Sequence, residues 1–268
     1  MSMDIHAHAF HPKIAAKTIT QLQGHYGIKA SGNGLVEDLL ARERAAGIAR
    51  VAVHSAATTP AQVIPANKWA LELARNYPEI EAFGTMHPGF EDIGTELDRL
   101  RQAGIRGLKF HADFQGFFLD DPGFYRVLEA AGSDFVLMFH VGDRLPPEKN
   151  PSCPIKLARI RRDFPGPAII AAHFGGYLHW DWAIEHLAGS DIYMDTSSAL
   201  PFMSQEQLDA ILRRHPFERL LFGSDYPLGD PGEEIELARR RLHLSDGRLA
   251  DLLDNAEQLF ADAGAQQG

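Results

Sequence analysis

The chain has 268 residues, 45% of them hydrophobic and 23% charged, and its 26 basic and 36 acidic side chains give a net charge of −10. This length fits one α/β barrel, and the negative charge, with no Lys/Arg-rich run, argues against a nucleic-acid-binding protein. The sequence contains no run of eighteen apolar residues, so no membrane span is predicted. Its single cysteine, Cys153, excludes an intrachain disulfide. We therefore expect a cytoplasmic protein.

Short apolar runs alternate with amphipathic segments along the whole chain. The predicted strands cover residues 4–8, 50–54, 80–87, 106–111, 135–140, 168–173, 191–195 and 219–225. Helices are predicted at residues 12–22, 35–46, 65–76, 90–103, 122–131, 154–164, 178–188, 204–215, 231–242 and 245–261. The glycine-rich stretch 24–34 is predicted to be a loop.

Eight strand–helix units without a linker predict one domain over residues 1–268. Such alternation predicts a parallel sheet, and eight units at this length favour a closed (β/α)8 TIM barrel. An open doubly wound sheet is the alternative. No Gly-x-Gly-x-x-Gly follows a strand, which disfavours a dinucleotide-binding version of that sheet.

Histidines gather at one position in these units, the carboxyl end of a strand. The chain has 13 histidines, and those at strand ends are His6, His8, His54, His87, His111, His140 and His173. Active sites of such barrels lie at this end, whereas solvated histidines would be scattered. The pattern therefore predicts a site at one mouth of the barrel.

A metal site is the first expectation for that mouth. Residues two apart on a strand point to the same side, so Asp4, His6 and His8 share one face. Strands one and eight are neighbours in a closed barrel and strand five lies across it, which brings in His140 and Asp225. Imidazole and carboxylate suit zinc, with manganese, iron or cobalt as alternatives. We therefore predict one divalent ion on His6, His8, His140 and Asp225, with Asp4 in support.

The chain resembles the amidohydrolase superfamily, and within it the amidohydrolase-2 group that includes the aminocarboxymuconate-semialdehyde decarboxylase-like proteins. The matching segments are Asp4-Ile5-His6-Ala7-His8, Gly107-Leu108-Lys109-Phe110-His111, His140, His173-Phe174-Gly175-Gly176, Gly223-Ser224-Asp225-Tyr226-Pro227 and Asn255-Ala256-Glu257-Gln258-Leu259-Phe260. The order and spacing of these segments cover the whole chain. The resemblance implies a (β/α)8 barrel with one divalent metal on His6, His8, His140 and Asp225, and a catalytic His173.

The predicted activity is metal-dependent hydrolysis, in which a metal-activated water attacks an amide, ester or lactone carbonyl of a small organic substrate. Asp225 is expected to accept the proton of that water, and His173 to polarise the substrate or move a proton. The alternative is a metal-dependent, non-oxidative decarboxylase (carboxy-lyase) of an unsaturated or aromatic acid. A non-catalytic metal- or ligand-binding barrel is a third possibility. Assembly into a homo-oligomer stays open.

Lys109 allows two interpretations. In binuclear members of the superfamily a lysine at the end of strand four is carboxylated and bridges two metals, and His173 would then become a ligand. Otherwise Lys109, His111 and Arg144, which lies in the loop after strand five, are expected to bind an anionic group of the substrate.

Overall fold

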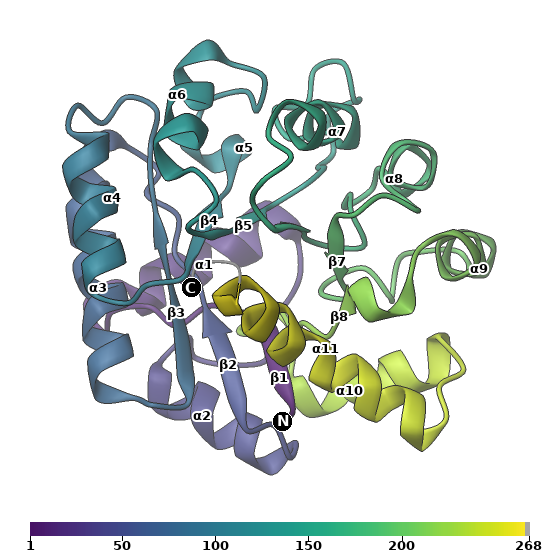
Figure 1. Cartoon of the computed structure of the whole chain (residues 1–268). Helices are drawn as coiled ribbons and strands as arrows, with labels where there is room; N and C mark the ends of the chain where they lie inside the picture. The colour runs from purple at the N-terminus through teal and green to yellow at the C-terminus, as the bar shows by residue number, and fades with distance from the viewer. Residues whose placement is uncertain (266–268) are drawn as a thin grey trace.

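Eight parallel strands, hydrogen-bonded in sequence order, form the wall of the computed structural model, which describes residues 1–265 (Figure 1). The strands are β1 Met3–Ala7, β2 Arg50–Val53, β3 Ile80–Thr85, β4 Gly107–Phe110, β5 Val136–Phe139, β6 Ile169–Ala171, β7 Tyr193–Asp195 and β8 Leu220–Leu221. Between β8 and β1 the amide of Ile5 donates to Phe222 O at 2.9 Å, and that of Asp225 to His6 O at 2.7 Å. These bonds join the two edges of the sheet, and the predicted (β/α)8 barrel is confirmed.

The helices lie outside and across the ends of this wall. They are α1 Ala15–Tyr26, α2 Val36–Ala45, α3 Val63–Asn76, α4 Ile93–Gln102, α5 Ala112–Gln115, α6 Pro122–Ala131, α7 Pro154–Asp163, α8 Trp180–His186, α9 Gln205–Arg214, α10 Pro231–Arg241 and α11 Asp246–Ala265. Two short 3-10 turns, Pro60–Gln62 and Phe217–Arg219, precede α3 and β8. None of the helices within residues 1–265 combines the length and the apolar composition that a membrane crossing needs.

Helix α1 is the largest departure from the predicted elements. It begins at Ala15 and runs through Gly24 to Tyr26, into the stretch that was predicted to be a loop. A helix-interior glycine costs only about 1 kcal/mol, and Gly27, at φ 72°, supplies the left-handed cap that ends the helix. The extension matters for function because it carries Tyr26 over the mouth of the barrel.

Strand β1 contains a bulge that the alternation of residue types did not predict. Its register against β2 shifts between Asp4 and Ala7. Met3 and Ile5 belong to the apolar cluster inside the barrel, yet His6 also faces inward and lines the cavity at the mouth. The expectation that Asp4 shares a face with His6 and His8 is therefore wrong. Bulges re-aim side chains in this way next to active sites.

The inside of the barrel is filled below the mouth. Its apolar cluster consists of residues on the strands, one residue directly after β6 and three residues of α11, namely Met3, Ile5, Ala52, Phe83, Val136, Met138, Ile170, Ala172, Leu221, Ala256, Leu259 and Phe260. Figure 1 shows α11 lying across one end of the barrel. The packed end leaves the carboxyl ends of the strands to form a site.

Candidate active site at the barrel mouth

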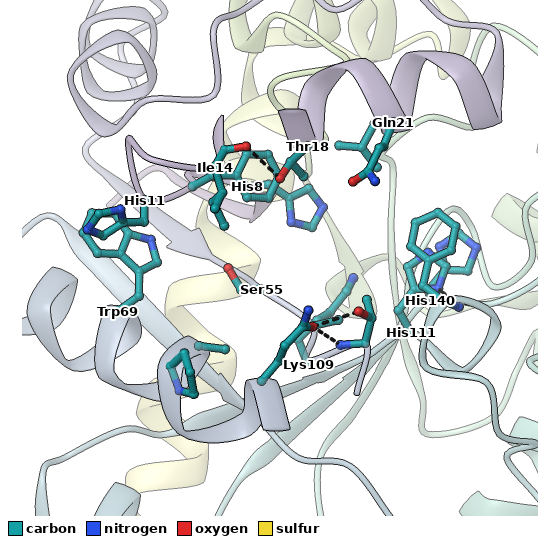
Figure 2. Close-up of a pocket in the computed structure, with 18 of the residues that line it drawn as sticks. His8, His11, Ile14, Thr18, Gln21, Ser55, Trp69, Lys109, His111 and His140 are labelled. Atoms are coloured by element: carbon teal, nitrogen blue, oxygen red, sulfur yellow. Dashed lines mark hydrogen bonds between the residues drawn. The ribbon is translucent and has the colours of Figure 1, made fainter. Parts of the chain in front are cut away.

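A cavity of about 970 Å³ opens at the carboxyl ends of the strands. Seven of the eight predicted site residues line it, namely His6, His8, Lys109, His111, His140, His173 and Asp225. They come from the ends of β1, β4, β5, β6 and β8. In Figure 2, His8 and Lys109 lie on opposite sides of the hollow, and His111 and His140 close one end of it.

The rings of His6 and His8 are both held through Nδ1. In His6 this nitrogen lies 3.0 Å from Asp195 Oδ2, and in His8 it lies 3.1 Å from the carbonyl oxygen of His54. Both partners accept hydrogen bonds, so each Nδ1 carries the proton and each Nε2 keeps a lone pair. Burial and the neighbouring Lys109 lower the pKa of His6, which keeps this ring neutral.

Asp225 faces both of these lone pairs. Its Oδ1 lies 3.6 Å from His6 Nε2 and 3.3 Å from His8 Nε2. Two ligand atoms about 2.1 Å from one tetrahedral ion lie about 3.4 Å apart, so the three groups fit a divalent cation. Nitrogen lone pairs and a carboxylate oxygen repel at this distance unless a proton or a cation lies between them.

The Asp225 carboxylate is held in its charged form. Burial alone would raise its pKa, but a proton that His8 Nε2 donates to it and the nearby imidazoles of His6 and His173 bring the pKa below its ordinary value. A cation bound here would take the place of that proton on His8 Nε2. Its other oxygen, Oδ2, accepts a hydrogen bond from Ser198. The segment that leads to Asp225 can lie this close to β1 because residue 223 is a glycine; a Cβ there would lie 2.8 Å from the Cβ of His6.

Lys109 lies at the bottom of the cavity, and its side chain is only 1% exposed. Its Nζ is 3.1 Å from His6 Nε2. Burial lowers the pKa of Lys109 to about 8, against the opposing influence of the Asp195 and Asp225 charges. The ammonium group thus occupies the lone pair of His6 that a metal ion would use, and Lys109 must move or change its charge when a cation binds there.

His140 lines the cavity but lies outside this group. Its Nδ1 is 3.0 Å from His173 Nε2, and its Nε2 is 2.9 Å from the carbonyl oxygen of Gly142. The Gly142 carbonyl can only accept, so Nε2 carries the proton and the lone pair of the neutral ring is on Nδ1, which faces His173. His140 as a fourth metal ligand remains a prediction, and it would bind through Nδ1 and keep its hydrogen bond to Gly142.

His111, Asp113 and His140 form a second group whose ligand atoms lie within 4.8 Å of one another. The two imidazoles stack in parallel, with centroids 3.8 Å apart and 7° between the planes. In-plane lone pairs of parallel stacked rings do not converge on one ion, and Nε2 of His111 already bonds Tyr26 Oη at 3.1 Å. This group is better described as a packed wall of the cavity than as a metal site.

Arg144 is the predicted site residue that the structure does not bring to the cavity. Its guanidinium is exposed and donates to the carbonyl oxygen of Tyr26 at 3.0 Å, at the end of α1. It is absent from the cavity lining. Lys109 and His111 therefore remain the inner candidates for an anionic group of the substrate.

Asp195, which the sequence analysis missed as a functional residue, organises the centre of the site. Besides His6 it accepts hydrogen bonds from the amide of His173, at 3.1 Å, and from the amide and hydroxyl of Ser197. His173 in turn places Nδ1 2.9 Å from the carbonyl oxygen of Ser197. Its position in the sequence could have indicated this role, because Asp195 ends a predicted strand, as His140 and His173 do.

The turns that hold these groups are strained. Among residues 1–265 the non-glycine residues with positive φ include His173 at 61°, Ser198 at 48° and Asp225 at 57°. Such conformations cost roughly 1–3 kcal/mol each and concentrate at functional sites. All three follow strand ends, where the surrounding hydrogen bonds hold them.

Asp195→Asn is expected to weaken metal binding about 10–100-fold, the usual cost of losing a carboxylate behind a ligating histidine. The amide can donate to His6 Nδ1, which would move the ring proton to Nε2 and remove the lone pair. Zinc titration monitored by a competing chelator measures the change. Asp191→Asn, an exposed position just before the same strand, is the matched control, and equal affinities for both variants would contradict the role of Asp195.

Comparison with known proteins identifies the family of the chain. The family model with the description Amidohydrolase (Amidohydro_2) matches residues 3–261. No curated protein matches the chain.

Solved structures share the fold at low sequence identity. A 5-carboxyvanillate decarboxylase from Novosphingobium aromaticivorans with bound manganese is 16% identical with a TM-score of 0.72, and 97% of both chains is covered. A Pseudomonas putida protein with a proposed 2-pyrone-4,6-dicarboxylic acid hydrolase activity is 18% identical, with a TM-score of 0.67 and 97% of both chains covered. A 2,6-dihydroxybenzoate decarboxylase from Rhizobium is 15% identical, with a TM-score of 0.66 and 97% and 98% coverage.

At these identities the solved structures support the barrel alone. The family model spans nearly the whole chain, and the matched range contains His6, His8, His173 and Asp225, which line the mouth. Sequence pattern and site geometry lead to one conclusion: this chain belongs to the amidohydrolase family.

Proposed function

We propose that the protein is a metal-dependent hydrolase acting on a carbonyl-type bond, an amide, ester or lactone, of a small organic substrate. The observation that carries the proposal is the position of Asp225 Oδ1, which lies 3.6 Å from His6 Nε2 and 3.3 Å from His8 Nε2. An ionised carboxylate at this place is a base ready to accept the proton of an attacking water. We favour zinc for the cation, because imidazole and carboxylate ligands suit it, while manganese is a close alternative.

A divalent cation bound at His6, His8 and Asp225 would supply Lewis-acid polarisation of a carbonyl group and of a water molecule. The residues of the chain supply the rest. Asp225 accepts a proton and can return it to the leaving group. His173 lines the cavity, with its Nε2 3.0 Å from His140 Nδ1, and is placed to hold or move a proton on the substrate.

Lys109 supports a second candidate function, decarboxylation. Its buried ammonium, beside His6 and close to Asp225, could bind a substrate carboxylate. Decarboxylation also needs an acid to protonate the product carbon, and Asp225 in its charged form does not provide one. The proton donor would have to come from the His140–His173 pair. Decarboxylation therefore requires an additional acid that hydrolysis does not need.

Removing the metal tests both candidates. Prolonged dialysis against a chelator is expected to lower turnover at least about 100-fold, with recovery on adding zinc or manganese. Metal content and activity are followed together in the same samples. Full activity in protein shown to be metal-free would contradict the proposal.

Product analysis then separates the two reactions. The protein is incubated in ¹⁸O-labelled water with panels of lactones, esters and amides, and separately with aromatic and unsaturated acids. Hydrolysis places ¹⁸O in a new carboxyl group and releases no carbon dioxide. Carbon dioxide release without label in the organic product would establish the carboxy-lyase instead.

A further inference from the structure

The cavity extends beyond the barrel mouth into a space between α1 and α3, which we call the outer arm. Its lining residues recur on one face of each helix, three or four positions apart. They are Ile14, Thr18, Gln21, Leu22 and His25 beside or on α1, and Ile64, Pro65, Lys68, Trp69 and Glu72 on α3. The helical spacing shows that both helices direct a continuous face into this space.

The walls of the outer arm are apolar and firmly attached to the strand that carries the site. Trp69 donates from its indole nitrogen to the carbonyl oxygen of Ala9 at 2.8 Å, directly after β1. His11 packs edge-on against Trp69, with centroids 5.2 Å apart. Ile14 is 51% exposed and lines the cavity. Figure 2 shows Trp69 and His11 at one end of the hollow, and His111 and His140 at the other.

Two lysines mark the solvent side of the outer arm. Lys13 and Lys68 line the cavity and are exposed, and neither takes part in an ion pair among residues 1–265. One acidic residue, Glu72, lies in the same arm. Two lysines and one glutamate leave a local charge of +1, in a chain whose net charge is −10. The arm therefore favours an anion against the overall charge of the protein.

We propose that the outer arm binds the far end of the substrate, and that this end is an apolar, ring-containing body with a terminal anionic group held by Lys13 and Lys68. The proposal rests on the proposed function for the inner end, where the reaction takes place. A cavity of about 970 Å³ is near the top of the roughly 300–1,000 Å³ range of small-molecule sites. It has room for such a body as well as the reacting group.

Binding of two matched probes tests the outer arm without any turnover. Isothermal titration calorimetry compares 4-phenylbutyrate with the neutral 4-phenyl-1-butanol, and quenching of Trp69 fluorescence, absent in Trp69→Phe, places the probe in the arm. The acid is expected to bind about tenfold more tightly than the alcohol, the usual size of a charge-assisted contact. Combined Lys13→Ala and Lys68→Ala substitution should remove most of this preference and leave alcohol binding unchanged.

Lys17→Ala is the matched control, since Lys17 lies on α1 but outside the cavity lining. An acid preference that survives the double lysine substitution would overturn the proposal, because the anion would then be bound at the inner cations. Failure of either probe to quench Trp69 would overturn it as well. Repeating the titrations in Asp225→Asn separates the two hypotheses, because arm binding should persist where hydrolysis is lost.

Discussion

Asp225→Asn is expected to lower turnover by about 10²–10⁴-fold, the usual contribution of a positioned base, and to weaken metal binding in the same protein. The substitution removes the negative charge and the proton acceptor at one step, while the side chain keeps its shape. Asparagine also tolerates the left-handed conformation of Asp225, at φ 57°, so the backbone of the turn should survive. Turnover is measured under saturating metal, and metal affinity by titration.

The control for this variant is Glu81→Gln, which also neutralises a buried carboxylate. Glu81 lies in β3 and pairs with Arg50 and Arg106, away from the cavity lining. It is expected to lose stability and to retain metal and turnover. If Asp225→Asn remained active with metal bound, the proton would have to be accepted elsewhere and the proposed role of Asp225 would fail.

His173→Asn is expected to lower turnover by a similar factor of about 10²–10⁴ while the protein keeps one metal equivalent. His173 lies outside the His6–His8–Asp225 group and contacts His140 and Ser197. It also belongs to another group, with His6 and Asp195, whose ligand atoms lie within 4.8 Å of one another; in that group His6 Nδ1 is already bonded to Asp195. Asparagine is chosen because His173 also has positive φ, at 61°, which alanine would strain.

Metal analysis of this variant separates the two interpretations of Lys109. Loss of one of two metal equivalents would favour a second ion bridged by a carboxylated Lys109, with His173 as its ligand. Retention of a single equivalent, with the lost rate recovered in part by added imidazole, would support His173 as a proton carrier. Unchanged turnover would contradict both roles.

The outer arm has a consequence for the choice of substrates in such experiments. Compounds that consist of one ring and one reacting group would fill only the inner end of the cavity. Binding energy from parts of a substrate far from the reacting group increases kcat. Small test compounds that lack these parts should therefore show a lower kcat as well as weaker binding. Panels should therefore include compounds with a second, anionic end.

The residues at the mouth could be predicted from the sequence because the position of a residue along a barrel strand determines the end of the barrel at which it lies. Side chains at the carboxyl ends of its strands meet at one face. His140, His173 and Asp225 end a predicted strand, and His6 and Lys109 lie two residues before the end of one. Their shared position follows from the alternation of strands and helices alone. Their mutual orientation does not, because it depends on which hydrogen bond each ring makes.

Three features lay beyond that rule. The bulge in β1 turns His6 inward after Ile5, although strict alternation would have placed them on opposite faces. Asp195 ends a predicted strand, but the pattern does not indicate that it contacts His6 Nδ1 instead of the cavity. Arg144 follows the strand that carries His140, yet its side chain reaches the end of α1 instead of the cavity.

By itself, then, the sequence determined the barrel, the mouth that bears the site and the kinds of ligand atom gathered there, since these depend on local periodicity and on the order of strands. Only the tertiary structure decided which imidazole nitrogens remain free and that Lys109 contacts His6. It also decided that α1 and α3 enclose an outer arm beside the mouth. These depend on contacts between residues 60 to 189 positions apart, and no local pattern encodes the direction of a side chain over such a separation.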